Sequence, residues 1–369
     1  MNITRRELIH HTGQASLALS LPLACASTVD LSGGIDPSRE WVLAEKPSNP
    51  QMRDAVNVWI EEQSGKFALR IGVEALGQSW DKQLVWLDVA FADGTVYSLR
   101  DENGPTHAAL DAQGLASIRG SGPAQFQCLE AFKKWRVSFN GPVPKTTASN
   151  LLHNKKIEQP TAEINITVDM EMAAPPWAPG SMLAKDNTVL QGEQADFISP
   201  RYEQLFRCAG ALTIDGKPQP FSGNGLRIRR QGVRKFEGFW GHCWQSAVFP
   251  SGKAFGFNVF PPRDDGQPSY NEGYIFTGSG GLQPATAVVI PWLRELTTGG
   301  DNVSFELTTK DGQVSISGTT FINTRSLHAG LVPDDFPIVQ QAHAHYTWEG
   351  ESTVGMVERS SVPSLIRNA

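Results

Sequence analysis

The sequence predicts an all-β protein built from antiparallel strands, and two patterns carry this prediction. Along residues 164–172 every second side chain is apolar and the intervening ones are polar, which places the apolar set on one face of a strand. Asp-Gly pairs at 93–94, 215–216 and 311–312 separate strand-like runs and are typical of tight hairpin turns. Many short strands between frequent turns indicate a barrel or a sandwich.

Residues 1–26 have the composition of a removable export signal. An Arg pair at 5–6 precedes a moderately apolar run over 12–24, and the segment ends in small residues around Cys25. The run is too short for a bilayer, which needs about 20 residues. The Arg pair favours twin-arginine export to the bacterial periplasm or medium. An amphipathic first helix is one alternative. Lipid anchoring at Cys25 is another, although Pro22 stands where lipoprotein signals usually have Leu.

The mature chain is expected to divide into two β halves, at 27–184 and 185–369. Pro- and Gly-rich stretches over 141–161 and 173–200 interrupt the strand pattern. The boundary is placed near residue 185, inside the second stretch, because the whole mature chain is large for one antiparallel barrel.

Composition and motifs exclude several classes of function. The formal net charge is −6, and an acidic chain of this kind is a poor match to nucleic acid or an anionic membrane. The sequence has no G-x-S-x-G elbow, H-E-x-x-H pair, P-loop or dinucleotide-binding fingerprint, so we expect no cofactor. Cys128, Cys208 and Cys243 are odd in number and lack metal-type spacing. We therefore expect no disulfide framework.

A first candidate site is the pair His343 and His345. Two His at i and i+2 on a strand point to the same face, a geometry that metal ligands use. With Glu349 the segment approaches the H-x-H-x3-E ligand pattern of cupins, and His242 could supply a further ligand. A metal-dependent enzyme is therefore one alternative, while solvated strand histidines are the commoner reason for such a pair.

A second candidate is the aromatic segment 238–244. On a strand, Trp240, His242 and Trp244 share one face, which places an imidazole between two indole rings. Such a trio could form the wall of an apolar cavity at the mouth of a barrel. Ordinary core packing of the two tryptophans is the alternative.

A third candidate is a cluster of arginines over residues 225–234. Its members are Arg227, Arg229, Arg230 and Arg234. Arg227 and Arg229 share a strand face and could clamp a carboxylate or a sulfate. Such a cluster beside the cavity would favour a ligand with an anionic end. The alternative is a solvated face that pairs with nearby Asp and Glu.

Four segments resemble the superfamily of AttH and hydroxyneurosporene synthase (carotenoid 1,2-hydratase). The run 130–141 is similar to the family's P-x-K-x-W-R-V-x-x-D-G segment, and 202–216 to its H-Y-E-Q stretch with the following glycines. The runs 225–234 and 345–358 fall where the family has two further motifs. The resemblance spans roughly residues 40–360 and implies two lipocalin-like (calycin) β-barrel halves. Members include hydratases of isoprenoid double bonds.

The resemblance has one departure that bears on chemistry. Where the family has Asp-His-Ser-Trp, this chain has Ile-Arg-Arg-Gln over 228–231. Hydration of an alkene needs an acid and a stabilised cation, which this replacement does not supply. Glu203, Glu358 and His242 are the remaining candidates for proton transfer. Tyr202 and Gln204 lie within the H-Y-E-Q-like motif and are candidates for ligand binding. The other candidates for ligand binding are Arg227, Arg229, Arg234, Trp240 and Trp244.

The sequence thus predicts an exported double-calycin protein that binds a hydrophobic small molecule, such as an isoprenoid, a steroid or a fatty-acid-like compound. In an enzymatic version it would act as a lyase or an isomerase without a cofactor. A metal-dependent enzyme and a non-catalytic envelope binding protein are the alternatives.

Overall fold

The computed structural model describes most of the chain beyond the expected export signal. The described residues are 29–43, 45–105, 117–119, 122–155, 160–187, 189–190, 197–198, 200–326, 332 and 335–368. The signal at 1–26, including Cys25, lies outside them. Within this part of the chain, no helix has the length and the hydropathy that crossing a bilayer requires.

Strands make up nearly all of the regular structure. The first ten are β1 (Met52–Glu62), β2 (Phe67–Leu76), β3 (Lys82–Phe91), β4 (Thr95–Pro105), β5 (Ser117–Arg119), β6 (Ala124–Glu130), β7 (Lys134–Thr147), β8 (Thr161–Met172), β9 (Arg201–Ile214) and β10 (Lys217–Val233). The others are β11 (Gly241–Val248), β12 (Lys253–Val259), β13 (Asn271–Thr277), β14 (Gln283–Val289), β15 (Phe305–Thr309), β16 (Gly312–Arg325), β17 (Ile338–Trp348) and β18 (Glu351–Ser361). The short helices are α1 (Ala148–Leu152), η1 (Pro37–Glu40), η2 (Gly77–Ser79) and η3 (Pro363–Leu365).

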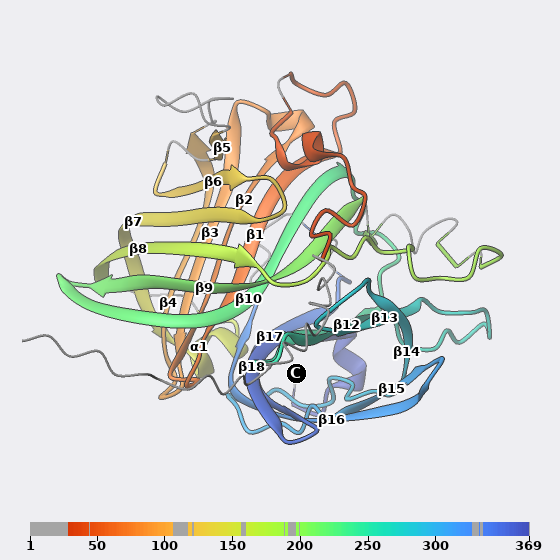
Figure 1. Ribbon diagram of the computed structural model, residues 1–369. Helices are drawn as coiled ribbons and strands as arrows, with labels where there is room; N and C mark the ends of the chain where they lie inside the picture. Colours follow the sequence, from red (N-terminus) through yellow and green to blue (C-terminus); the bar gives the residue numbers. More distant parts are fainter. Residues whose placement is uncertain are drawn as a thin grey trace, which may run out of the picture.

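These strands form two antiparallel sheets, which confirms the all-β prediction (Figure 1). The first is a ten-stranded sheet in the order β4-β3-β2-β1-β10-β9-β8-β7-β6-β5, with an additional pairing of β4 and β7. The second is a closed barrel of β11 to β18 in sequence order. Each strand of the barrel therefore pairs with the next one along the chain, so its topology follows directly from consecutive antiparallel connections.

The Asp-Gly pairs form hairpin turns as expected. Asp93-Gly94 joins β3 to β4, and Asp215-Gly216 joins β9 to β10. Asp311 lies in the turn between β15 and β16, and Gly312 is the first residue of β16. Asp215 and Gly216 have φ angles of 48° and 76°. A two-residue hairpin turn of the favoured hand needs positive φ at both central positions, which Gly adopts freely and Asp tolerates better than most residues.

The chain passes from the first sheet to the barrel well after residue 185, the predicted boundary. β9 pairs with β8 and β10 pairs with β1, so both belong to the first sheet, and residue 185 lies in the connection between β8 and β9. The barrel begins only at Gly241. The Pro- and Gly-rich stretch interrupts the strands without ending the sheet, because the chain returns to pair with the strand that it left.

Successive side chains of β1 point to opposite faces of the first sheet, and the two faces pack against different parts of the molecule. Val56, Val58 and Ile60 are fully buried in the core of the first sheet. Trp59 points the other way and packs in a second cluster with Trp244 of β11 and other barrel residues. The two indole rings meet edge to face, with centroids 6.2 Å apart and an interplanar angle of 82°. The barrel therefore covers a face of the first sheet that would otherwise meet solvent.

Candidate functional site

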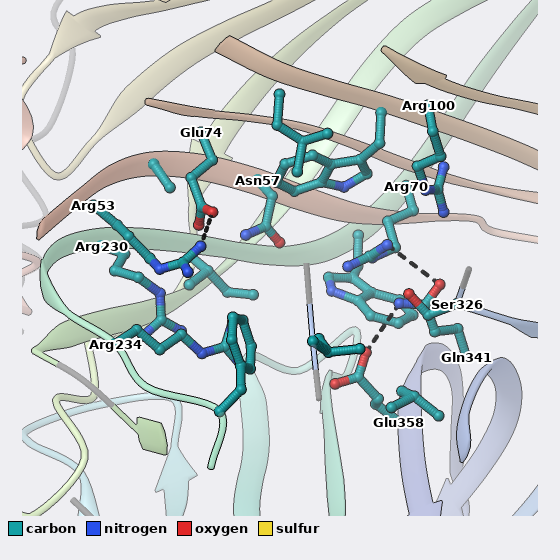
Figure 2. A pocket seen from close by; sticks show the side chains of 18 of the residues that line it. Arg53, Asn57, Arg70, Glu74, Arg100, Arg230, Arg234, Ser326, Gln341 and Glu358 are labelled. Carbon is teal, nitrogen blue, oxygen red and sulfur yellow. Dashed lines mark hydrogen bonds and ion pairs between the residues drawn. The ribbon is translucent and has the colours of Figure 1, made fainter. Parts of the chain in front are cut away.

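A cavity of about 410 Å³ lies where the first sheet faces the barrel. One wall comes from alternate residues of β1, β2 and β3, and the other from β11, β17 and β18. Figure 2 shows that the charged side chains gather at two ends. Arg53, Arg230 and Arg234 lie at one end, and Arg70, Gln341 and Glu358 at the other.

Much of the cavity lining is aromatic. Trp59, Trp86 and Trp244 line it, and so do Phe197, Phe236 and Phe336, of which Phe197 and Phe236 pack against Arg234. These rings are contributed by strands of both sheets and by the loops beside them, so the apolar surface exists only once the two sheets have packed together.

Gly72 allows one of these rings to reach the cavity. Asn57, Gly72 and Trp86 are cross-strand neighbours on β1, β2 and β3. A Cβ atom on Gly72 would come within 2.0 Å of Trp86 Cζ2 and 2.7 Å of Asn57 Cβ. The missing side chain therefore lets the indole lie across β2, and any larger residue there would displace it.

The basic end holds more arginines than carboxylates. Arg53 forms an ion pair with Glu74, and Arg201 pairs with Glu203 at 2.7 Å. Arg230 Nη1 donates to the carbonyl oxygen of Ile198 at 2.7 Å, and Arg234 Nε to that of Phe197 at 3.1 Å. Neither guanidinium has a carboxylate within ion-pair distance among the described residues.

Burial and the neighbouring positive charges disfavour the charged forms of Arg230 and Arg234. Burial lowers the pKa of Arg230 well below its usual value, and the neighbouring Arg234 and Arg201 lower it further. Burial and the nearby Arg53 bring the pKa of Arg234 to about 9. Both effects mean that the positive charge of these side chains is incompletely compensated by the protein.

The opposite end is a hydrogen-bonded chain around Glu358. Arg70 Nη1 donates to Gln341 Oε1 at 3.2 Å, and Gln341 Nε2 donates to Glu358 Oε2 at 3.1 Å. His242 Nε2 lies 3.2 Å from Glu358 Oε1. Burial alone would raise the pKa of Glu358, but His242, Arg70 and Gln341 together bring it down to about 2. The carboxylate is therefore ionised at any physiological pH.

The structure brings five of the candidate residues to the cavity. They are His242, Trp244, Arg230, Arg234 and Glu358. Glu203 lies behind this lining, where its carboxylate accepts from Trp244 Nε1 at 3.0 Å and pairs with Arg201. Burial raises the pKa of Glu203.

Four other candidates point into the first sheet instead. Arg227 pairs with Glu40 at 2.8 Å, and Gln204 Oε1 accepts from Arg227 Nη2 at 2.9 Å. The hydroxyl of Tyr202 donates to the same Glu40. Arg229 pairs with Asp54 at 2.5 Å. Arg227 and Arg229 do share a strand face, as expected, but it is the face opposite to the cavity, because the alternate residues of β10 turn towards the barrel.

Trp240 and the two strand histidines also lie outside the cavity lining. Trp240 precedes β11, and its Nε1 donates to the carbonyl oxygen of Pro261 at 3.0 Å. His343 Nδ1 lies 2.8 Å from Glu61 Oε1, and His345 is exposed with its ring 5.1 Å from that of Phe321. Among the described residues no three His, Cys, Asp or Glu side chains are grouped as metal ligands would be.

Sequence reasoning missed the residues that β1, β2 and β3 contribute. Their signal is polar side chains at alternate positions of strands whose opposite face is mostly apolar: Arg53 and Asn57 on β1, and Arg70 and Glu74 on β2. Alternation of this kind normally indicates a solvent-facing side. Only the barrel, which is distant in sequence, converts that side into the wall of a cavity.

The comparisons with known proteins agree with this fold. A family model described as a domain of unknown function (DUF7064) matches residues 46–363. None of the curated proteins matches the chain in sequence.

The solved structures that are similar to this chain include the following three. CghA has a TM-score of 0.50 at 12% identity and covers 85% of this chain and 89% of its own. CghA with Sch210972 has a TM-score of 0.51 at 11% identity, with the same two coverages. A protein described as AttH from Nitrosomonas europaea has a TM-score of 0.53 at 15% identity and covers 88% of this chain and 99% of its own. These likenesses confirm the calycin-type fold and the resemblance to AttH at the level of the fold.

Proposed function

The chain belongs to the family described as a domain of unknown function (DUF7064), and we propose that it binds a hydrophobic small molecule in the cavity between its two sheets. The observation that carries this proposal is the aromatic cavity of about 410 Å³ between the two sheets. Sites for small molecules are mostly apolar clefts of about 300–1,000 Å³ with a few converging polar groups. One of the similar structures contains a bound compound, CghA with Sch210972.

Polar atoms that a ligand could satisfy surround the cavity. Protein interiors are close-packed, and a buried polar atom without a partner costs about 1–3 kcal/mol. Several buried atoms of this lining have no hydrogen-bond partner among the described residues, and atoms of the same kind also occur elsewhere in the fold. Those of the lining are Arg53 Nε, Asn57 Oδ1, Trp59 Nε1, Arg70 Nε, Trp86 Nε1 and Asn258 Oδ1. Oxygen and nitrogen atoms of a ligand, or water, would satisfy them.

The protonation and the contacts of Glu358 and Glu203 favour ligand binding over a lyase reaction without a cofactor. Protonation of an alkene would need an acidic group that still holds its proton at neutral pH and faces the ligand. Glu358 faces the cavity, but its pKa is held near 2 by His242 and Arg70 against the effect of burial. Glu203 has a raised pKa through burial, yet its carboxylate is engaged by Arg201 and Trp244 behind the lining.

A proton-transfer reaction is the second candidate, and one observation favours it. His242 and Glu358 are 3.2 Å apart in the cavity wall, so the carboxylate could orient an imidazole that exchanges a proton with a bound ligand. An isomerase would be the enzyme class that such a base supports.

Export belongs to the proposal as well. Residues 1–26 would direct folded export by the twin-arginine route and be removed, with Cys25 as the site of a lipid anchor in the alternative. The intact mass of protein from the periplasm tests this: loss of the first 26 or so residues is expected, and a full-length mass contradicts it.

The binding proposal is tested with a neutral apolar dye and a variant that fills the cavity. Ala55 lines the cavity, so Ala55→Phe is expected to weaken binding of Nile red about tenfold or more by occupying its place. Ala209 is exposed on β9, so Ala209→Phe is the matched control and should bind as the wild type does. Equal binding by Ala55→Phe, with its fold retained by circular dichroism, would remove this cavity as the site.

Metal content of the purified protein tests the remaining alternative at His343 and His345. Stoichiometric metal that is lost in His343→Ala would favour a metal-dependent enzyme over the binding proposal.

A further inference from the structure

We infer that Arg53, Arg230 and Arg234 form an anion subsite, and that the ligand carries an oxyanion group (carboxylate, sulfate or phosphate) at that end of its apolar body. The inference rests on the proposed function and makes it more specific: the ligand is an amphiphile. Its charged group would face the three arginines, which Figure 2 labels, and its apolar part would lie against Trp59, Trp86 and Trp244 of the lining.

The pairing of charges carries the argument. Each of the other arginines around the cavity lies within ion-pair distance of a carboxylate, although Arg70 and Arg100 share one: Arg201 pairs with Glu203 at 2.7 Å, and Arg100 with Asp88 at 2.7 Å. Arg70 lies 4.0 Å from the same Asp88. At the basic end Glu74 is bound by Arg53, which leaves Arg230 and Arg234 with backbone carbonyls as their hydrogen-bond acceptors in the described part of the chain.

A buried arginine such as Arg230 normally has a carboxylate as its partner, so its lack of one among the described residues is unusual. Arg230 is 6% exposed, and burying an ion without a counter-ion costs several kcal/mol. The lowered pKa values of Arg230 and Arg234 have the same cause. A bound anion would provide the missing charge, and it would be attracted more strongly here than in water because the site is shielded from solvent.

Aromatic rings hold the guanidinium groups in place before any ligand arrives. The guanidinium carbons of Arg53 and Arg234 lie 4.9 Å and 4.7 Å from the centroid of the same Phe236 ring. Arg234 also lies 4.5 Å from the centroid of Phe197. Stacked guanidinium groups keep their planar edges free to donate paired hydrogen bonds, which is the geometry that carboxylates, sulfates and phosphates accept.

Within β10, Arg227 and Arg229 differ in role from Arg230: the first two stabilise the fold, whereas Arg230 belongs to the anion subsite. Those two guanidinium groups are fully buried on the other face of β10 and are neutralised by Glu40 and Asp54. Removal of either should therefore destabilise the fold. Removal of Arg230 or Arg234 takes an uncompensated charge out of the interior, so the ligand-free variants should be as stable as the wild type or more so.

The test compares dodecanoate with 1-dodecanol, which differ in the anionic group but share the apolar chain. The wild type should bind dodecanoate at least about tenfold more tightly than the alcohol, as charge-assisted hydrogen bonds imply. The double variant R230Q/R234Q should lose this preference while its affinity for the alcohol is unchanged. Arg136 pairs with Asp169 on the exposed surface of β7 and β8, so R136Q is the matched control and should keep the preference.

A second arm tests the subsite without the apolar body. Sulfate and inorganic phosphate, each at constant ionic strength against chloride, should raise the Tm of the wild type and of R136Q more than that of R230Q/R234Q. Dodecyl phosphate against dodecanoate then distinguishes a phosphate from a carboxylate as the preferred group.

The outcomes separate this inference from the proposed function. If dodecanoate and dodecanol bind the wild type equally, the anion subsite is wrong and the hydrophobic site stands. If neither binds but sulfate still stabilises only proteins that contain Arg230 and Arg234, the subsite stands as an anion site and the hydrophobic ligand is wrong. If R230Q/R234Q keeps the full preference for dodecanoate, other residues bind the anion and the inference fails.

Discussion

Arg227 and Glu40 form an ion pair of 2.8 Å in which both side chains are fully excluded from solvent. Glu40 ends the short helix η1, ahead of the first strand, while Arg227 lies in β10. The carboxylate also accepts from Trp135 Nε1 at 2.7 Å and from the backbone N–H of Phe132 at 2.9 Å. One carboxylate thus joins the N-terminal segment, β7 and β10.

The first prediction concerns this pair. Glu40→Gln leaves the buried guanidinium of Arg227 without a counter-ion, so the free energy of unfolding should fall by about 3–5 kcal/mol. Urea denaturation measures this loss. Glu130→Gln, which removes an exposed carboxylate paired with Lys133, is the control and should unfold at the wild-type urea midpoint. A change of less than about 1 kcal/mol for Glu40→Gln would contradict the structural role of the pair.

The second prediction is acid sensitivity centred on Glu358. Its ordinary pKa is 4.5, and in the fold the pKa is about 2, so its contribution to stability is complete above about pH 4.5 and is lost as the pH falls towards 2. Glu40 and Asp88, whose pKa values are also lowered by neighbouring cations against the effect of burial, add to the same trend.

The free energy of unfolding, measured as a function of pH, tests whether stability falls on acidification as predicted. Glu358→Gln should be less stable than the wild type at neutral pH and should lose less on acidification, so that the two proteins converge towards pH 2. Parallel curves over that range would show that Glu358 has an ordinary pKa in the fold.

The third prediction concerns Gly72. Gly72→Val places carbon atoms where Trp86 lies, so the indole should move and the affinity for Nile red should fall about tenfold, with a loss of stability of about 1–3 kcal/mol from overpacking. A Cβ atom added to Gly281 would have no other atom within 4 Å, so Gly281→Ala is the control and should behave as the wild type does. Unchanged dye binding by a folded Gly72→Val protein would mean that Trp86 does not shape the site.

The fourth prediction is that the cysteines are inert in the folded protein. Cys128, Cys208 and Cys243 are buried and unpaired with one another. Burial raises the pKa of all three thiols, to about 12 for Cys128 and about 11 for Cys243. Iodoacetamide near pH 8.5 should therefore leave them unmodified until guanidinium chloride is added. Peptide mass mapping follows each residue separately, and rapid labelling of any of the three in the native protein would contradict its burial.

Much of the fold could be predicted from local pattern. The alternation along 164–172 became β8, in which every second residue is buried, and the Asp-Gly pairs became turns between neighbouring strands. Both features depend on residues close together in the chain, since strand faces and hairpin turns are set by the local backbone. The boundary near 185 depended on composition and on the length of the chain, and neither reveals that β9 pairs with β8.

The arginine-rich strand shows where local pattern stops being informative. Its alternation correctly separates Arg227 and Arg229 from Ile228 and Arg230. It does not reveal which of the two faces meets Glu40 and Asp54 and which meets the cavity, because those partners come from 40–54 and from the barrel.

The sequence by itself therefore determined the strands, their hairpins and the two faces of each strand. Only the tertiary structure decided which face became the wall of the cavity, by packing the barrel against alternate residues of β1, β2 and β3. The physical reason is that a polar strand face has the same local pattern in water as in a cavity. The difference lies in what covers it, and that is decided by contacts between residues far apart in the chain.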